Sequence, residues 1–361
     1  MTAMYNCKTL KLARESRGLS QSKLADMLKI TQATLSRFEK GQLPISDSVI
    51  AEASKVLSYP LAFFQMSISV NEDTTLFYRK RASMTVKELS VLESRISILA
   101  NSIDELADSI EIPELRIPSV EPSPDNTPSE IAFKIRNYLK IPSGPVDNIV
   151  SILEKNGVVV VFLELDGMDK FDGITMFTQK QIPVIWLNKN MPNDRKRFSL
   201  SHELGHLVMH LRSEDFDKAE ETKEQEANEF ASEFLMPESQ CKLDLFGLKY
   251  KDLGLRKQYW KVSKAALIHR AQELNCIPAQ TAQYLYITLG RNGERKNESV
   301  NVSIDEPQIL KKMTDLHVTE LKYTMEELSD IVGLGIQEIR SSLMGENKTI
   351  SLRPAKISLS F

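Results

Sequence analysis

The sequence predicts a mostly α protein with a small β-sheet, of the α+β class. Two observations lead to this prediction. Segments with apolar residues at every third or fourth position dominate the chain, and residues 157–163 and 183–187 read as short buried strands. Because a series of helical segments precedes both strands, we expect an all-helical first domain followed by a domain that holds the sheet.

The amino-terminal domain is expected to be a compact set of helices. Four are predicted, over residues 10–17, 20–28, 31–41 and 46–57. Gly18 closes the first, and Ser20 is a suitable N-cap for the second. The second and third segments resemble the helix-turn-helix of phage-repressor (Xre/Cro) domains, in which Ala25, Ile30 and Leu35 would wedge the two helices together.

This resemblance implies DNA binding through the second helix of the motif. That helix lies in the major groove, and its N-terminal residues meet base edges. The exposed candidates for base contacts are Gln32, Ala33, Ser36 and Arg37. Gln is suited to adenine, Arg to guanine and Ala to the methyl group of thymine. Gln21 and Thr31 are better placed for phosphates. A DNA operator is therefore the first expected partner.

Charge supports DNA binding locally and not globally. The whole chain has a formal net charge of −3, whereas residues 1–41 hold eight Lys or Arg against three acids. The alternative is a helical domain that keeps the fold without reading DNA and serves as a dimer or substrate adaptor.

A connecting region follows the first domain. Residues 76–83 are expected to form a strand with a basic end, and residues 85–110 one long helix. Apolar residues along that helix alternate in steps of three and four, which suits a coiled-coil-like seam. The seam either packs on the body of its own chain or pairs with a second copy, so a homodimer is possible. The next residues, 111–129, are rich in proline and predict an extended linker.

The most informative stretch is RFSLSHELGHLVMH, residues 197–210. His202 and His206 are four residues apart, so a helix places both imidazoles on one face, where they can bind one zinc ion. Glu203 is placed to hold a water against that metal as general base. His210 falls on the same helical stripe. A helix whose histidines merely pack against a core is the alternative interpretation.

A second helix offers the third ligand. It is expected over residues 220–236 and ends at Pro237. Glu224 and Asn228 form an i, i+4 pair on it, so the carboxylate would complete a three-ligand site and the amide would support it. Three protein ligands and one open position are typical of catalytic zinc.

Several motifs in order resemble the ImmA/IrrE metallopeptidases. They are Asp172-Gly173, PVIWLN at 183–188, the 197–206 motif and ExxANxFAxxFLMP at 224–237, and the resemblance runs from about residue 131 to about 297. It implies a zincin-like peptidase domain in which the third ligand is the Glu four residues before the Asn, here Glu224. Glu226 remains a near alternative. Ser201 departs from the family, where Ala commonly precedes the His-Glu pair.

These observations divide the chain into five predicted units. They are a helix-turn-helix domain (1–66), a strand plus long connecting helix (67–112), a Pro-rich linker (113–129), an ImmA/IrrE-like zinc peptidase domain (130–297) and a C-terminal helical segment (298–361). The three cysteines are scattered, no apolar run is long enough to span a bilayer, and no signal-peptide pattern is present, so we expect a cytoplasmic protein without a membrane partner.

The primary functional prediction is a regulatory zinc endopeptidase tethered to a DNA-binding domain. By resemblance, its substrate is a repressor or a toxin–antitoxin partner protein. Two alternatives remain: a transcriptional repressor whose metal domain senses a signal without turnover, and a toxin held in check by a neighbouring gene product.

Overall fold

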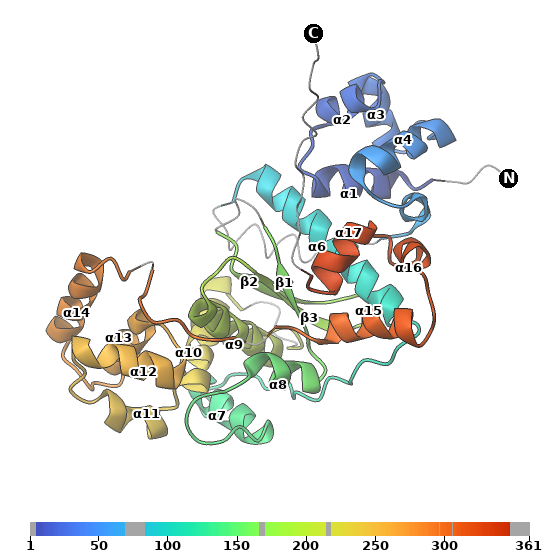
Figure 1. Ribbon diagram of the computed structural model, residues 1–361. Helices are drawn as coiled ribbons and strands as arrows, with labels where there is room; N and C mark the ends of the chain where they lie inside the picture. Colours follow the sequence, from blue (N-terminus) through green and yellow to red (C-terminus); the bar gives the residue numbers. More distant parts are fainter. Residues whose placement is uncertain are drawn as a thin grey trace, which may run out of the picture.

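The structure is a computed structural model that describes residues 5–68, 84–165, 170–213, 218–295, 297–304 and 306–346. Helices predominate in it, and a single three-stranded sheet lies near the middle of the molecule, which confirms the α+β class (Figure 1). Among the described helices, none is long and apolar enough to cross a membrane.

The amino-terminal domain has the expected helices. They are α1 (Cys7–Ser16), α2 (Gln21–Met27), α3 (Gln32–Glu39) and α4 (Asp47–Leu57), followed by the 3₁₀ helix η1 (Leu61–Gln65). The side-chain oxygen of Ser20 accepts a hydrogen bond from the backbone N–H of Lys23 at 3.2 Å, which confirms the predicted N-cap. Gly18 follows α1 with a φ of 65°, a conformation that favours glycine. Ala25 and Leu35 are buried between α2 and α3.

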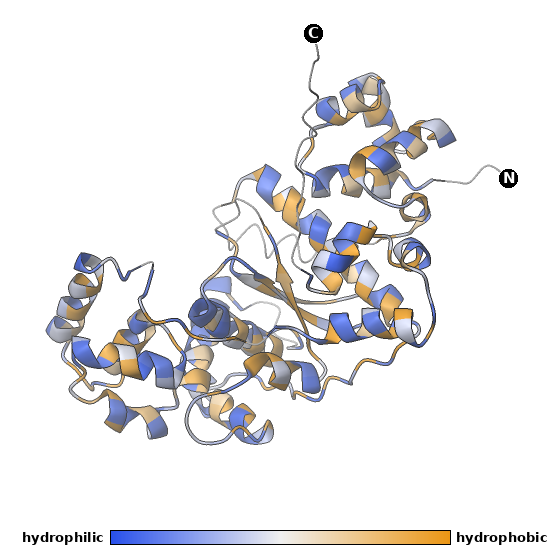
Figure 2. Cartoon of the chain, in the orientation of Figure 1, coloured by the Kyte–Doolittle hydropathy of each residue, from blue (hydrophilic) through white to orange (hydrophobic). Residues whose placement is uncertain are grey.

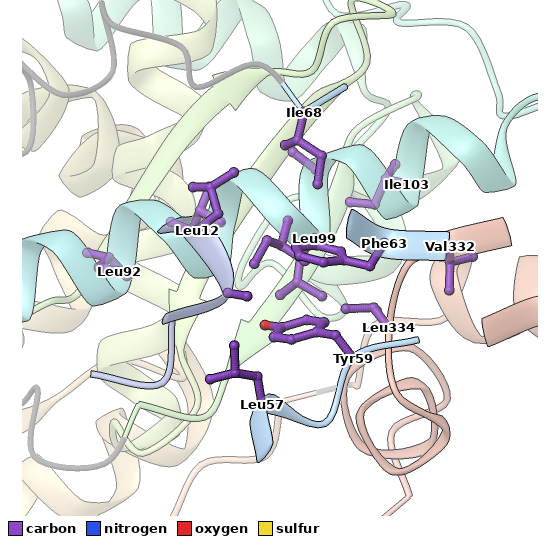
Figure 3. Packing of buried hydrophobic residues seen from close by; sticks show 14 of the residues in the cluster. Leu12, Leu57, Tyr59, Phe63, Ile68, Leu92, Leu99, Ile103, Val332 and Leu334 are labelled. Atoms are coloured by element: carbon purple, nitrogen blue, oxygen red, sulfur yellow. The ribbon is translucent and has the colours of Figure 1, made fainter. Parts of the chain in front are cut away.

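The long connecting helix is α6 (Val86–Leu106), four residues shorter at its C-terminal end than expected. It begins with a capping box between Thr85 and Glu88. Leu92, Leu99 and Ile103 are buried and pack with residues of the amino-terminal domain and of the C-terminal helices (Figure 3). The chain itself therefore covers the apolar seam, and the alternative in which α6 pairs with a second copy is wrong. The strand expected over residues 76–83 lies outside the described residues.

The sheet has the order β1-β3-β2. Strand β1 (Val159–Leu163) runs parallel to β3 (Pro183–Asn188), and β2 (Gly173–Phe177) runs antiparallel to β3. The sequence predicted β1 and β3 but not β2. One face of the sheet, including Trp186, packs into the core that contains α6, and the opposite face, including Ile185, packs into the core that contains α9. Figure 2 shows the hydrophobic colouring concentrated on these strands.

Four helices lie around the second face of the sheet. They are α7 (Pro128–Tyr138), α8 (Ile149–Lys155), α9 (Asn193–Met209) and α10 (Glu220–Leu235). Helix α9 packs against β2, β3 and α10. The extended segment before α7 follows this part of the molecule: Ile117 is buried, and the N–H of Val120 donates to the carbonyl of Val208 at 2.9 Å.

The remaining helices form two groups. The first is α11 (Glu238–Leu245), η2 (Tyr250–Asp252), α12 (Leu253–Trp260), α13 (Lys264–Glu273) and α14 (Ala279–Arg291). The second is α15 (Ile309–Thr319), α16 (Met325–Val332), α17 (Ile336–Glu338) and the π-helical turn η3 (Ile339–Leu343). Gly333 ends α16 with a φ of 69°. Helices α15 and α16 both pack on α6, so the second group joins α6 to the body of the molecule.

Candidate metal centre

Helices α9 and α10 bring three potential ligands together. The Nε2 atoms of His202 and His206 are 3.1 Å apart. Carboxylate oxygens of Glu224 lie 3.4 Å from His202 Nε2 and 3.3 Å from His206 Nε2. The predicted i, i+4 histidine pair therefore faces one point, and α10 supplies a carboxylate to the same point.

These separations fit a zinc ion. Bonds of about 2.0–2.1 Å in tetrahedral geometry place neighbouring ligand atoms about 3.3 Å apart. Two imidazole nitrogens and one carboxylate oxygen are also a ligand set that zinc uses in hydrolytic enzymes. The side chains of His202, His206 and Glu224 thus have both the chemistry and the spacing for this metal.

The two acidic candidates on α10 have different surroundings. Glu224 faces His202 and His206, whereas Glu226 lies 2.9 Å from His210 Nε2 and 2.6 Å from Lys218 Nζ. The geometry therefore favours Glu224 as the third ligand.

The second nitrogen of each histidine also has a partner. His202 Nδ1 lies 3.0 Å from the side-chain oxygen of Asn228, the residue expected to support the site. His206 Nδ1 lies 3.0 Å from His210 Nδ1. Burial, together with the neighbouring His206, lowers the pKa of His210 to about 4, so that its ring is neutral near pH 7.

Glu203 occupies the position expected for a general base. It is 3 % exposed and lines the same cavity of about 270 Å³ as His202 and Glu224. The hydroxyl of Thr175, on β2, donates to Glu203 Oε2 at 2.8 Å and lies 3.2 Å from the Glu203 carbonyl oxygen. Sequence reasoning missed Thr175, because it did not predict the strand that carries it.

Buried contacts hold α9 in place. Arg197 is completely buried and donates to the backbone carbonyls of Val146, Asp147 and Lys261. Gly205 permits the close approach of α10, since a Cβ there would meet the Phe230 ring at 3.2 Å. Arg197 and Gly205 therefore fix the position of the helix that carries His202 and Glu203.

The candidate DNA-binding residues lie on and beside α3. Gln32, Ala33 and Arg37 are exposed, and Ser36 is half-buried. The hydroxyl oxygen of Thr31, expected to contact phosphate, caps α3 by accepting a hydrogen bond from the N–H of Thr34 at 3.1 Å.

Gln21 links the two helices of the motif. Its Nε2 donates to Glu39 at 2.8 Å, and its side-chain oxygen accepts from Gln32 Nε2 at 2.8 Å. Glu39 in turn is paired with Arg14 at 2.6 Å inside the domain. This network sets the orientation of Gln32, which the sequence could not indicate.

Comparison with known families gives a match for two parts of this chain. Residues 153–272 match the family described as the IrrE N-terminal-like domain, and residues 10–64 match the helix-turn-helix family. No curated protein matches the sequence. The chain thus joins a DNA-binding helix-turn-helix domain to an IrrE/ImmA-like peptidase domain, and the resemblance drawn from the sequence motifs is confirmed.

Proposed function

Given this union of a helix-turn-helix domain with an IrrE/ImmA-like peptidase domain, we propose that the protein is a regulatory zinc-dependent endopeptidase. The observation that carries the proposal is the approach of His202, His206 and Glu224 to the ligand spacing of tetrahedral zinc. Glu203, as the general base, lines the same cavity as His202 and Glu224.

The residues of the site divide the chemistry between them. When bound, zinc would acidify a water molecule and polarise the scissile carbonyl. Glu203 takes a proton from the attacking water and returns it to the leaving amine. Because Thr175 already holds one Glu203 oxygen at 2.8 Å, the base needs little reorganisation before it acts.

A polypeptide substrate fits the surroundings of the site. Strand β2 pairs with β3 on one edge, and no strand of the described residues pairs with its other edge. Such an edge can add an extended peptide through main-chain hydrogen bonds. The cavity next to it is lined in part by Phe171, Ile174 and Phe198, which suit an apolar side chain. By family resemblance the substrate would be a repressor or a toxin–antitoxin partner.

Metal content and cleavage test the proposal together. The wild-type protein and Glu203→Gln should each carry about one zinc per chain, and His206→Ala should carry none. Wild-type protein should cleave a protein encoded beside its own gene, and Glu203→Gln should not. Glu221→Gln, an exposed change on α10, is the matched control and should cleave normally. Equal cleavage by Glu203→Gln would refute the assignment, and stable binding without cleavage would favour a non-cleaving repressor.

We also propose that the amino-terminal domain binds a specific operator through Gln32, Ala33, Ser36 and Arg37. Their position on α3, the second helix of the motif, in a domain with a local excess of basic residues, supports this role. Affinity for the operator should fall steeply with salt, because phosphate contacts release counterions.

A further inference from the structure

A chain of hydrogen bonds leads away from His206 on the side opposite Glu224. His206 Nδ1 lies 3.0 Å from His210 Nδ1, and His210 Nε2 lies 2.9 Å from Glu226 Oε2. The other carboxylate oxygen of Glu226 forms an ion pair with Lys218 at 2.6 Å. The side chains of His210 and Glu226 are 5 % and 15 % exposed, so bulk water has little access to the chain of bonds.

The chemistry of these groups fixes where each proton lies. A carboxylate paired with an ammonium can only accept, so His210 Nε2 carries the hydrogen that is donated to Glu226. A neutral imidazole has one N–H, which leaves His210 Nδ1 as an acceptor. His206 Nδ1 must then be the donor, and its Nε2 is left without a proton. That nitrogen is the one that faces His202 and Glu224.

We propose that His210 and Glu226 are positioning residues, which hold His206 in the single tautomer able to bind a metal through Nε2. The inference rests on the proposed metal centre and adds to it two supporting residues, His210 at the C-terminal end of α9 and Glu226 on α10. Asn228 supports His202 in a comparable way, at 3.0 Å from its Nδ1. Loss of such support typically weakens metal binding about 10–100-fold.

Two substitutions with side chains of similar shape test the contact between His206 and His210. His210→Asn places an amide oxygen close to the position of Nδ1, so it can still accept from His206, whereas His210→Leu has no acceptor. Zinc affinity, measured by competition with a chromophoric chelator, should fall about 10–100-fold in His210→Leu and stay within a few-fold of wild type in His210→Asn. Equal, wild-type affinity in both variants would overturn the proposal, since packing alone would then explain the position.

A second pair tests Glu226. Glu226→Gln removes the charge that orients His210, and Glu221→Gln removes an exposed charge from the same helix. The first should weaken zinc binding several-fold, and the second should leave it unchanged. Wild-type affinity in Glu226→Gln would exclude a role for the carboxylate.

Nitrogen-15 NMR of the histidine rings reads the tautomer without any metal. In the metal-free wild-type protein, His206 should carry its hydrogen on Nδ1, and in His210→Leu that preference should be lost. A hydrogen on His206 Nε2 in the metal-free wild type would overturn the inference. Failure of the wild-type chain to bind zinc, with the Nδ1–H tautomer present, would instead count against the proposed function.

Discussion

At the scale of single residues, the hydroxyl of Thr175 supports the candidate base, Glu203. It donates to Glu203 Oε2 at 2.8 Å from a position that is 5 % exposed. Thr175→Val keeps the shape and removes the donor, so we expect kcat to fall about tenfold or more while zinc content stays unchanged. Steady-state kinetics and metal analysis check this. Thr222→Val, exposed on α10, is the control, and an unchanged kcat in Thr175→Val would show that the contact serves packing alone.

The pKa of Glu294 predicts how the stability of the fold changes at acid pH. Hydrogen bonds from Lys264 first, and also from Ser299 and Tyr250, lower its pKa from 4.5 to about 2. A carboxyl whose pKa is lower in the folded state stabilises the fold above its unfolded pKa and loses that contribution as pH falls toward the folded value. We therefore expect stability to decline between about pH 4.5 and 2.

Urea denaturation across this range provides the test. Glu294→Gln should be less stable than wild type at pH 6, and the difference should shrink as the pH approaches 2. A difference that is constant with pH would mean that the carboxylate charge makes no contribution.

Two ligands of the metal centre could be predicted from the sequence because they lie close together in it. The spacing of His202 and His206 alone places both rings on one face of a helix. The choice between Glu224 and Glu226 depends on how α10 crosses α9, which spacing within one helix cannot determine. The sequence placed His210 on the same helical face as His202 and His206. Its partner Glu226 lies 16 residues away, so the contact between them became apparent only in the folded chain.

At the scale of elements, the strand that was not predicted is the one closest to the site. Strand β2 has only five residues, and its central three are all buried, so it lacks the alternation by which a half-buried strand is recognised. Strands β1 and β3 are marked by longer runs of Val, Ile and Leu. The helix start marked by the N-cap Ser20 was predicted more closely than the C-terminal end of α6.

Gly173 sets the packing between β2 and β3. A Cβ at this position would lie 2.4 Å from Leu187 Cδ2 and 3.0 Å from the Trp186 carbonyl oxygen. Gly173→Ala should therefore destabilise the fold by about 1–3 kcal/mol through overpacking. Gly290→Ala is the control, because Gly290 lies in α14 with no atom within 4 Å of its Cβ position, and it should be neutral or stabilising. Urea denaturation measures both, and equal stability of the two variants would contradict the steric argument.

Helix α3 carries the test of DNA recognition. Arg37 is exposed there, and Arg37→Ala should cost about 1–3 kcal/mol of specific binding if it contacts guanine through two hydrogen bonds. Arg291→Ala removes the same charge from α14, on the far side of the molecule (Figure 1), and should leave operator binding unchanged. Titration of the protein with labelled operator measures specific binding, and titration with unrelated DNA measures non-specific binding. Equal loss on both DNAs would assign Arg37 to phosphates.

At the scale of the whole molecule, one hydrophobic core joins the helix-turn-helix domain to the sheet. It extends from Leu10 of α1 through Leu99 of α6 to Trp186 of β3 and Val332 of α16. Polar contacts follow the same path: Arg17 pairs with Glu338 at 2.7 Å. The amphipathic pattern of α6 predicted a buried seam. It could not identify which surface buries it, because that depends on helices more than 200 residues later in the chain.

Because the core is continuous, we expect a destabilising change in the amino-terminal domain to lower the stability of the peptidase domain as well. Phe63 is completely buried in η1 and lies next to α6 and α16 (Figure 3). Phe63→Ala should lower the free energy of unfolding by about 3–5 kcal/mol. Because both domains share the core, we expect one cooperative transition, in which helix loss seen by circular dichroism coincides with the fluorescence change of Trp186 and Trp260.

The matched control for that experiment lies two residues away. Leu61, on the same 3₁₀ helix, is 50 % exposed, so Leu61→Ala should leave both transitions at the wild-type temperature. In Phe63→Ala both transitions should move down together by several degrees. If circular dichroism instead shows an early partial loss of helix while the tryptophan transition stays in place, the two domains unfold independently. The core shared across α6 would then transmit no stability from the DNA-binding domain to the peptidase sheet.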